Sequence, residues 1–201
     1  MRDEALRIVA LGGTPDAGSS TERALGVAVR AAKAAGAEVS VFDGTFMTRL
    51  PFYRAAPHER DSEAQAFVEA VRQADGMLIA SPGWHGSISG LTKNAIDYIE
   101  ETARDPRPYL DGVPVGLIAT AYGWQATGST LATLRAIVHA LRGWPTPLGA
   151  AVNTSGGVFQ GEACVVESVQ AQLESVARQV VEFAAITRLG RAAATAISLP
   201  A

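Results

Sequence analysis

The sequence predicts an α/β domain whose five-stranded parallel sheet is covered by helices on both faces. Short apolar runs alternate along the 201-residue chain with stretches in which apolar residues recur at helical spacing. This alternation favours a parallel sheet, because each right-handed crossover lays its helix against one face. The composition fits one such domain, with 48% hydrophobic residues, 18% charged residues and a net charge of -3.

Five short runs are expected to form the strands, and they span residues 6–11, 38–42, 77–80, 113–120 and 148–152. The first run, LRIVAL, is rich in buried-strand residues and ends at a pair of glycines. The other four runs are expected to complete the same parallel sheet.

Helical stripes separate these runs. In the first stripe, apolar side chains recur at Leu25, Ala28, Val29 and Ala32, and a glycine at position 36 ends the helix. Further helices are expected around residues 64–71, 91–99, 131–141 and 162–187. The sequence therefore predicts one domain over residues 1–187. The alanine-rich residues 188–201 are expected to form a poorly ordered tail.

Charge and cysteine content exclude several classes of function. The chain is slightly acidic and lacks a basic cluster, which argues against a nucleic-acid groove. Its apolar runs fall short of the roughly 20 residues that span a bilayer. Its first residues carry acids rather than the features of a signal peptide. Cys164 is the only cysteine, which excludes an intramolecular disulfide and a cysteine-rich metal site. These features predict a cytoplasmic protein.

Three unusual segments follow the first, third and fourth expected strands. They read GGTPDAGSST at 12–21, SPGWHGSISG at 81–90 and AYGWQATGST at 121–130. Parallel strands present their carboxyl ends at one edge of the sheet, where ligands of such folds bind. The three segments are therefore expected to form one site.

The first segment has the equipment to hold a phosphate. Its glycines permit a close backbone approach, and the helix that follows offers unpaired N–H groups to an anion. Hydroxyl groups are available on Thr14, Ser19, Ser20 and Thr21. Ser19 and Glu22 also fit the S-x-x-E capping box, and both interpretations can hold together. Neither G-x-G-x-x-G nor the P-loop pattern is present, which disfavours a dinucleotide or nucleoside triphosphate loop.

The second and third segments combine glycines with aromatic side chains. Gly83 and Gly86 would let backbone amides reach the edge of a ligand, Trp84 offers an aromatic face and His85 a hydrogen bond. The alternative is a buried tryptophan beside a solvated histidine. The third segment offers similar chemistry at Tyr122, Gly123, Trp124, Gln125 and Thr127. Two such segments side by side suit a planar heterocycle better than a sugar or a metal.

The second segment carries a family resemblance. Ser81-Pro82, S-I at 87–88, G-L at 90–91 and K-N-A-I-D at 93–97 match a motif of the type S-P-E-Y-x-x-S-I-P-G-x-L-K-N-A-I-D, and L-P-F-Y at 50–53 resembles an L-P-L-Y segment. Over about residues 5–186 the chain resembles the NADPH-dependent FMN reductase family of flavodoxin-like proteins.

This resemblance implies a flavodoxin-like three-layer sandwich with strand order 2-1-3-4-5, which binds FMN non-covalently and takes electrons from NADPH or NADH. It implies a homodimer or homotetramer. The phosphate would be held by Thr14, Ser19 and Thr21. The isoalloxazine would be bordered by Pro82, Gly83, Trp84, His85, Tyr122 and Gly123, with Gly86 and Ser87 shaping the turn. Lys93, Asn94 and Asp97 would fix the helix that follows.

The chain departs from the family at several of these positions. The family often has Arg where this chain has Asp16, Asn where it has Thr21, and Glu-Tyr where it has Gly83-Trp84. An acid beside a phosphate is unfavourable, so FMN is expected to bind more loosely than is usual for the family. Two interpretations of Arg23 stay open: it compensates for the acid, or it is simply exposed.

The expected function is electron transfer from NAD(P)H through FMN to a flavin, quinone or similar small acceptor. No catalytic side chain is expected, because the flavin N5 carries the chemistry. The alternatives are a non-enzymatic electron carrier of the flavodoxin type and a flavodoxin-like module with weak or lost FMN binding. A loosely held flavin would suit a flavin-dependent oxygenase as partner.

The segment that precedes the second helix suggests an oligomer. It concentrates large apolar residues in an expected loop, namely Phe46, Met47, Leu50, Phe52 and Tyr53. We expect a homo-oligomer that uses this segment and the helix that begins near Leu91.

Overall fold

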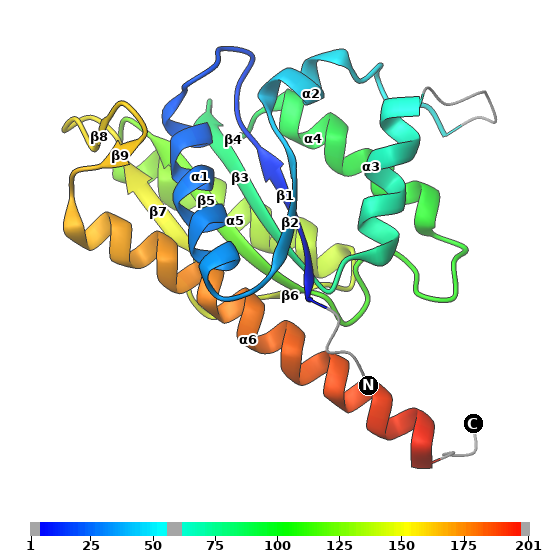
Figure 1. Cartoon of the computed structure of the whole chain (residues 1–201). Helices are drawn as coiled ribbons and strands as arrows, with labels where there is room; N and C mark the ends of the chain where they lie inside the picture. Colours follow the sequence, from blue (N-terminus) through cyan, green and yellow to red (C-terminus); the bar gives the residue numbers. More distant parts are fainter. Residues whose placement is uncertain (1–4, 56–61, 198–201) are drawn as a thin grey trace.

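The computed structural model describes residues 5–55 and 62–197. Its main sheet is built on the strand order β2-β1-β3-β5-β6, as Figure 1 shows. The strands on this path are β1 (Arg7–Gly12), β2 (Glu38–Phe42), β3 (Gly76–Trp84), β5 (Pro114–Ala121) and β6 (Trp144–Pro145). They pair in parallel, and the predicted order 2-1-3-4-5 is confirmed.

The fifth position in the sheet is shared by two short strands rather than filled by one. β6 pairs with the start of β5, and β7 (Ala150–Asn153) pairs with its end. Pro147 lies between them, and a proline cannot donate to the strand ladder. The neighbouring N–H of Leu148 instead donates to Oε1 of Gln179 at 3.0 Å. β8 (Phe159–Gln160) and β9 (Ala163–Cys164) form a separate hairpin.

Helices cover both faces of the sheet (Figure 1). α1 (Ser20–Ala34) and α6 (Glu167–Ile197) pack on one face. The other is covered by α2 (Gly44–Arg49), α3 (Ser62–Gln73), α4 (Gly90–Asp97) with the short 3₁₀ helix η1 (Tyr98–Thr102), and α5 (Trp124–Ala140). None of the helices in the described part of the chain is long and apolar enough to cross a bilayer.

Alternate residues of each central strand point into the two halves of the core. In β1, Ile8 and Ala10 contact the α1 and α6 side, whereas Val9 and Leu11 contact the other side. A strand that is buried on both faces needs apolar residues at every position, as the run LRIVAL has. The continuous run is therefore explained by its place in the middle of the sheet.

Several predicted boundaries are corrected. β3 continues four residues beyond Ala80, to Trp84, and α5 begins at Trp124, inside the expected third loop. The last helix begins at Glu167 and runs to Ile197, past the predicted break at position 187. Arg188 is tied back to the domain by an ion pair with Asp75. Residues 198–201 lie outside the described part.

The aromatic segment that was expected to form a loop is largely packed into the domain. Residues 44–49 form α2, and Phe46, Met47 and Leu50 are buried in the core beside Phe67. Phe52 is 85% exposed, and Tyr53 is partly buried. The observation that suggested an oligomer surface here therefore holds for Phe52 alone among these large side chains.

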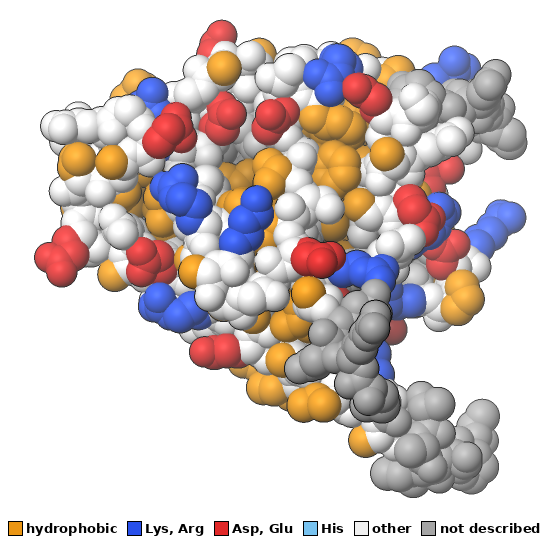
Figure 2. Space-filling view, in the orientation of Figure 1, with side chains coloured by type: hydrophobic (Ala, Val, Ile, Leu, Met, Phe, Trp, Pro, Cys, Tyr) orange, Lys and Arg blue, Asp and Glu red, His pale blue; other side chains and the backbone are white. Residues whose placement is uncertain are grey.

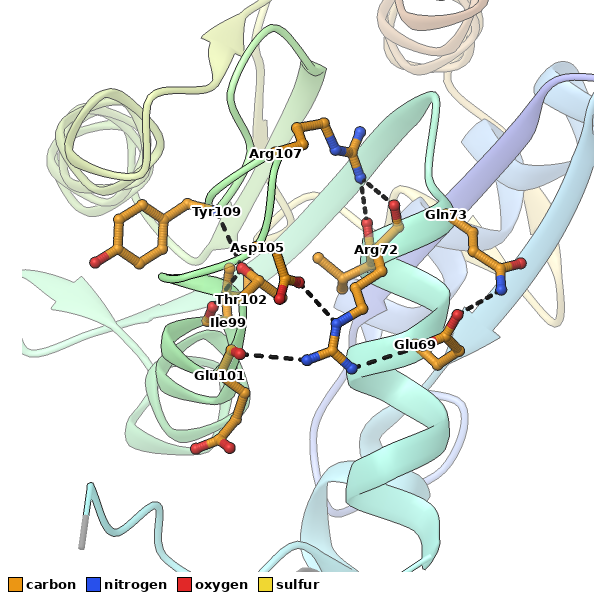
Figure 3. A network of polar contacts seen from close by, with 10 residues as sticks. Glu69, Arg72, Gln73, Ile99, Glu101, Thr102, Asp105, Arg107 and Tyr109 are labelled. Atoms are coloured by element: carbon orange, nitrogen blue, oxygen red, sulfur yellow. Dashed lines mark hydrogen bonds and ion pairs between the residues drawn. The ribbon is translucent and has the colours of Figure 1, made fainter. Parts of the chain in front are cut away.

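The amino end of the sheet is closed by arginine contacts (Figure 3). Nη1 of Arg107 donates to the carbonyl of Ala74 at 2.6 Å. Nη2 donates to the carbonyls of Val71 at 2.7 Å and Arg72 at 2.6 Å, the two contacts that Figure 3 draws from Arg107. Arg107 thereby satisfies the free carbonyl groups where α3 ends. Nε of Arg72 donates to Oδ2 of Asp105 at 2.7 Å in the same network.

Candidate functional site

The three unusual segments meet at the carboxyl edge of the sheet, at the top of Figure 1. A Cβ built on Gly12 would lie 2.4 Å from the carbonyl oxygen of Ala80, so the end of β1 packs closely against β3. One built on Gly83 would lie 2.6 Å from Oγ1 of Thr130, so β3 packs equally closely on α5. The first segment is joined to β5 as well, through a hydrogen bond between the hydroxyls of Thr21 and Thr120. The predicted convergence is confirmed by these contacts.

The first segment is held in place at both ends. A Cβ on Gly44, at the start of α2, would lie 1.8 Å from the carbonyl oxygen of Thr14, so only glycine fits there. At the other end, Oγ of Ser19 accepts from the N–H of Glu22 at 3.2 Å, which is the predicted helix cap. Oε2 of Glu22 accepts from the N–H of Gly18 at 2.7 Å, one residue before the usual partner of a capping box.

The threonine hydroxyls that were predicted to hold the phosphate are already engaged. Oγ1 of Thr14 donates to the carbonyl of Asp16 at 3.1 Å. Thr21 is buried, and its hydroxyl shares a 2.6 Å hydrogen bond with the hydroxyl of Thr120 on β5. Thr21 therefore fastens α1 to the sheet through its side chain. Ser19 uses its oxygen as an acceptor and keeps its hydroxyl proton for another partner.

Besides the serine hydroxyls, the donors that remain at this loop are backbone groups and one arginine. Among the described residues, the N–H groups of Ser20 and Thr21 have no partner, as is usual in the first turn of a helix. Nε of Arg23 is buried and has no hydrogen-bond partner there either. Nη2 of Arg23 would lie 3.4 Å from a Cβ on Gly18, so the side chain folds back against the loop. Arg23 is thus not simply exposed.

These donors fit a phosphate. Helix N–H groups and the helix dipole favour an anion, and a guanidinium hydrogen-bonds phosphate oxygens well. Asp16 is exposed at the tip of the loop. The carboxylate of Glu22 is occupied with Gly18. An anion beside the loop would give the buried Nε of Arg23 the hydrogen-bond partner that it lacks among the described residues.

The second segment is a β-hairpin rather than a plain elbow. β3 runs out to Trp84, turns through His85 and Gly86, and returns as β4 (Ser87–Ile88), which pairs antiparallel with β3. His85 has φ 52° and Gly86 has φ 87°. A two-residue turn with positive φ at both positions matches the twist of a hairpin. The hairpin carries Trp84 beyond the sheet, where it is 50% exposed, so the alternative of a buried tryptophan is wrong.

Buried polar contacts hold this hairpin on α4. Oγ of Ser81 accepts from the N–H of Ser89 at 3.1 Å, and Oγ of Ser89 accepts from the N–H of Thr92 at 3.1 Å as the cap of α4. The residues of the family motif thus have a structural role, because they fix the end of β3 to the start of α4. Asn94 extends it: its Nδ2 donates to the carbonyl of Pro51 at 3.0 Å, and its Oδ1 accepts from the N–H of Tyr53 at 2.9 Å.

The third segment is mostly helical. Only Tyr122 and Gly123 separate β5 from α5, and Gly123 is the N-cap residue. Tyr122 is 84% exposed and Trp124 is 67% exposed, both at the carboxyl edge. Thr127 is buried, and its Oγ1 donates to the carbonyl of Trp124 at 2.9 Å. The side chain of Thr127 therefore stabilises the start of α5 and is not available to a ligand. The exposed aromatic residues remain available for ligand binding.

A fourth segment at this edge was missed by the sequence interpretation. The N–H of Thr154, just after β7, donates to the carbonyl of Ala121 at 2.8 Å, and the N–H of Ser155 donates to Oδ1 of Asn153 at 3.1 Å. The polar run N-T-S-G-G directly follows the fifth predicted strand. Because that strand ends at the same edge, the run could have been assigned to the site.

The assembled edge combines two kinds of surface. The loop before α1 offers unpaired donors to an anion, and the hairpin and the start of α5 expose large aromatic side chains. Exposed aromatic groups that gather around polar donors are typical of a ligand surface. The arrangement suits a flat aromatic ligand that carries a phosphate.

The comparisons with known proteins agree with this geometry. Residues 6–157 match the family described as NADPH-dependent FMN reductase. The chain is 33% identical over 111 residues to a protein named FMN-dependent NADPH-azoreductase from Staphylococcus haemolyticus (strain JCSC1435), a match that covers 54% of this chain and 55% of that protein. The chain spans about half the length of the curated relatives it matches.

Two solved structures show the fold. FerB, a flavoenzyme NAD(P)H:(acceptor) oxidoreductase from Paracoccus denitrificans, has a TM-score of 0.70 at 17% identity, over 91% of this chain and 99% of that chain. A flavodoxin from Streptococcus pneumonia has a TM-score of 0.58 at 13% identity, over 89% of this chain and 99% of that chain. The fold is therefore flavodoxin-like. Because the family match extends over residues 6–157 of 201, the chain belongs to the NADPH-dependent FMN reductase family.

Proposed function

We propose that the chain is an NAD(P)H-dependent flavin oxidoreductase that binds FMN non-covalently at the carboxyl edge of its sheet. One observation carries this proposal: unpaired donors and exposed aromatic side chains lie together at that edge. Family membership supports FMN as the cofactor and a reduced nicotinamide as the electron donor. When bound, FMN supplies the chemistry that accepts a hydride and passes electrons on.

The first loop would hold the phosphate. Ser19 keeps a hydroxyl proton available, and the N–H groups of Ser20 and Thr21 point out of the first turn of α1 without a partner in the described structure. Thr14 would contribute by turning its hydroxyl away from Asp16. The contribution of Thr21 would come from its backbone, because its side chain is engaged with Thr120.

The second and third segments would border the isoalloxazine. Pro82 and Gly83 lie at the base of the hairpin, Trp84 and His85 at its tip. Gly86 and Ser87 shape the turn, and Tyr122 and Gly123 approach from the next strand. Trp84 and Tyr122 can exclude water from the flavin and orient it, while backbone N–H groups reach its polar edge.

A small flat molecule is the acceptor class that we propose. An aromatic edge with exposed side chains can admit a second planar compound, such as a flavin, a quinone or an azo compound. The names of the curated relatives support the azo class. A flavin-dependent oxygenase is the protein partner that we propose if reduced FMN leaves this open edge. Oxidation of its substrate in a coupled assay would test that partner.

The experiment is a titration of the purified protein with FMN, followed by NADPH oxidation with an azo dye or a quinone. We expect saturable binding, and oxidation that requires both FMN and the acceptor. FMN binding without NADPH or NADH oxidation would favour a flavodoxin-type electron carrier. Failure to bind FMN would favour a flavodoxin-like module that has lost its cofactor, and would contradict the proposal.

We also propose a homo-oligomer, through a surface that differs from the predicted one. Large apolar side chains are exposed along α6 and beside β6, namely Phe183 at 41%, Ile186 at 63%, Leu189 at 71% and Trp144 at 69%. Figure 2 shows hydrophobic side chains at the lower edge of the molecule, where α6 runs, and others interspersed with charges of both signs over the rest of that view. The ridge on α6 adjoins a hollow of about 520 Å³ lined by Trp144 and three prolines, so a second copy could fill it through a two-fold axis.

The test of this surface is sedimentation of the wild-type protein, Ile186→Glu and the control Phe52→Glu. We expect a dimer that Ile186→Glu dissociates and Phe52→Glu leaves intact. A 20.9 kDa monomer at micromolar concentration would contradict the oligomer. Dissociation by Phe52→Glu alone would restore the segment around Phe52 as the interface. We propose a cytoplasmic location, which a single cysteine supports and cell fractionation would test.

A further inference from the structure

Arg23 occupies an unusual place in the first loop. It lies in the first turn of α1, and its guanidinium folds back to within 3.4 Å of a Cβ position on Gly18. Its Nε is a buried side-chain nitrogen that has no hydrogen-bond partner among the described residues. Its charge likewise has no ion-pair partner in the described part of the chain.

The neighbouring acids do not balance this charge. Oε2 of Glu22 is hydrogen-bonded to the N–H of Gly18, and Asp16 is exposed on the loop tip. A guanidinium cannot lose its charge in a protein, and a buried donor that stays unpaired is costly. A bound anion is therefore the partner that this side chain lacks.

The other polar groups of the loop also favour Arg23 as the residue that binds the anion. Two of the three hydroxyl groups that were predicted to hold a phosphate are engaged, by the carbonyl of Asp16 and by Thr120. The donors that remain are mostly neutral. Arg23 is the cation closest in sequence to these donors, and charge-assisted hydrogen bonds are roughly twice as strong as neutral ones.

We propose that Arg23 is the residue that makes this site select a flavin that carries a terminal phosphate over one that does not. The guanidinium binds the phosphate from the helix side, while Glu22 keeps Gly18 and the loop in place. This inference rests on the proposed function, because it assumes that a flavin binds at this edge. It adds the residue that sets the preference for FMN over riboflavin.

The experiment is calorimetric titration of FMN and riboflavin into the wild-type protein, Arg23→Gln, Arg23→Lys and the control Arg30→Gln. Arg30 lies on the same helix, and its Nη2 donates to the carbonyl of Glu162 at 3.3 Å, away from the loop. Arg23→Gln should weaken FMN roughly 10- to 100-fold and leave riboflavin unchanged. The FMN affinity of Arg23→Lys should lie between those of the wild type and Arg23→Gln, because lysine keeps the positive charge but lacks the planar guanidinium. Arg30→Gln should bind both flavins as the wild type does.

Each outcome bears on a different claim. If Arg23→Gln binds FMN as the wild type does, or loses riboflavin equally, the assignment of Arg23 is overturned while the flavin site stands. If the wild type binds neither flavin, the proposed function fails first. A thermal midpoint at or above that of the wild type agrees with removal of an unpaired buried donor. If Arg23→Gln does not fold, the test rests on Arg23→Lys. A ratio of FMN affinity to riboflavin affinity that equals the wild-type ratio in this variant overturns the proposal.

Discussion

The two ends of the sheet each carry an arginine that is partly buried, and the two arginines differ in their partners. At the amino end, the guanidinium of Arg107 donates to three carbonyl groups at the end of α3. Its burial lowers its pKa, and the nearby charge of Arg191 lowers it further. At the carboxyl end, the buried Nε of Arg23 has no partner within the described residues.

This difference separates structural from functional polar groups. A fold that binds nothing at a given place pairs its buried donors with its own acceptors, as it does around Arg107 (Figure 3). Donors that stay unpaired beside exposed aromatic side chains, as around Arg23, indicate a place prepared for a ligand. The comparison therefore predicts that substitutions at the two ends have different consequences.

The largest effect should come from Gly44→Ala. The added Cβ would lie 1.8 Å from the carbonyl oxygen of Thr14, so either α2 or the first loop must move. We expect the free energy of unfolding to fall by about 3 kcal/mol or more, and FMN binding to be lost. The control is Gly128→Ala, an exposed helical position with nothing within 4 Å of the new Cβ, which should stabilise the protein by up to about 1 kcal/mol. Chemical denaturation measures both. A mild effect at Gly44 would mean that the loop is not firmly held.

The next largest effect should come from Arg107→Gln. It removes three hydrogen bonds from a half-buried guanidinium and should lower the free energy of unfolding by about 2 kcal/mol. The FMN affinity of the folded protein should not change, because the residue lies at the other end of the sheet. Denaturation and calorimetry on the same sample would check this. A weakened FMN affinity with normal stability would contradict the conclusion that Arg107 has a purely structural role.

The exposed tryptophans should have a smaller effect, confined to binding. Trp84→Ala and Trp124→Ala should each weaken FMN and riboflavin alike by about 1 kcal/mol, because an aromatic contact does not involve the phosphate. Trp144→Ala changes a tryptophan that is 69% exposed at the other end of the molecule and should leave both affinities unchanged. Equal losses in all three variants would point to a general disturbance rather than a site.

The smallest effect should come from Asp16→Arg. Asp16 is exposed, so a charge reversal there acts through solvent and should tighten FMN by less than about 1 kcal/mol. Riboflavin should gain less still. Titration of both flavins at low salt would detect the change. Equal gains for the two ligands would mean that Asp16 does not sense the phosphate.

The sequence predicts the sheet well because the signal for a central strand is local. A run such as LRIVAL can be recognised from its own residues, and the alternation of strands with helices leads directly to the confirmed strand order. The hairpin is not predictable from the sequence because S-P-G-W is not an apolar run. The positive φ of His85 in its turn also cannot be predicted from a residue pattern. The alanine-rich composition of residues 188–201 predicts a poorly ordered tail, whereas α6 continues to Ile197 because alanine is the strongest helix former.

The candidate site is predictable in outline and not in its details. Parallel-strand topology alone places the three segments at one edge. Which hydroxyls stay available depends on contacts distant in sequence, such as the one between Thr21 and Thr120. The unpaired nitrogen of Arg23 depends likewise on how the whole loop packs around it.

The most direct test of a flavin site at the carboxyl edge is a nitrogen–proton correlation spectrum of the three tryptophan indoles, with and without FMN. The chain has only Trp84, Trp124 and Trp144, and each signal can be assigned by a tryptophan-to-phenylalanine variant. We predict that FMN shifts the signals of Trp84 and Trp124 and leaves that of Trp144 in place. A shift of Trp144 alone, or no shift at a concentration that saturates binding, would contradict the account.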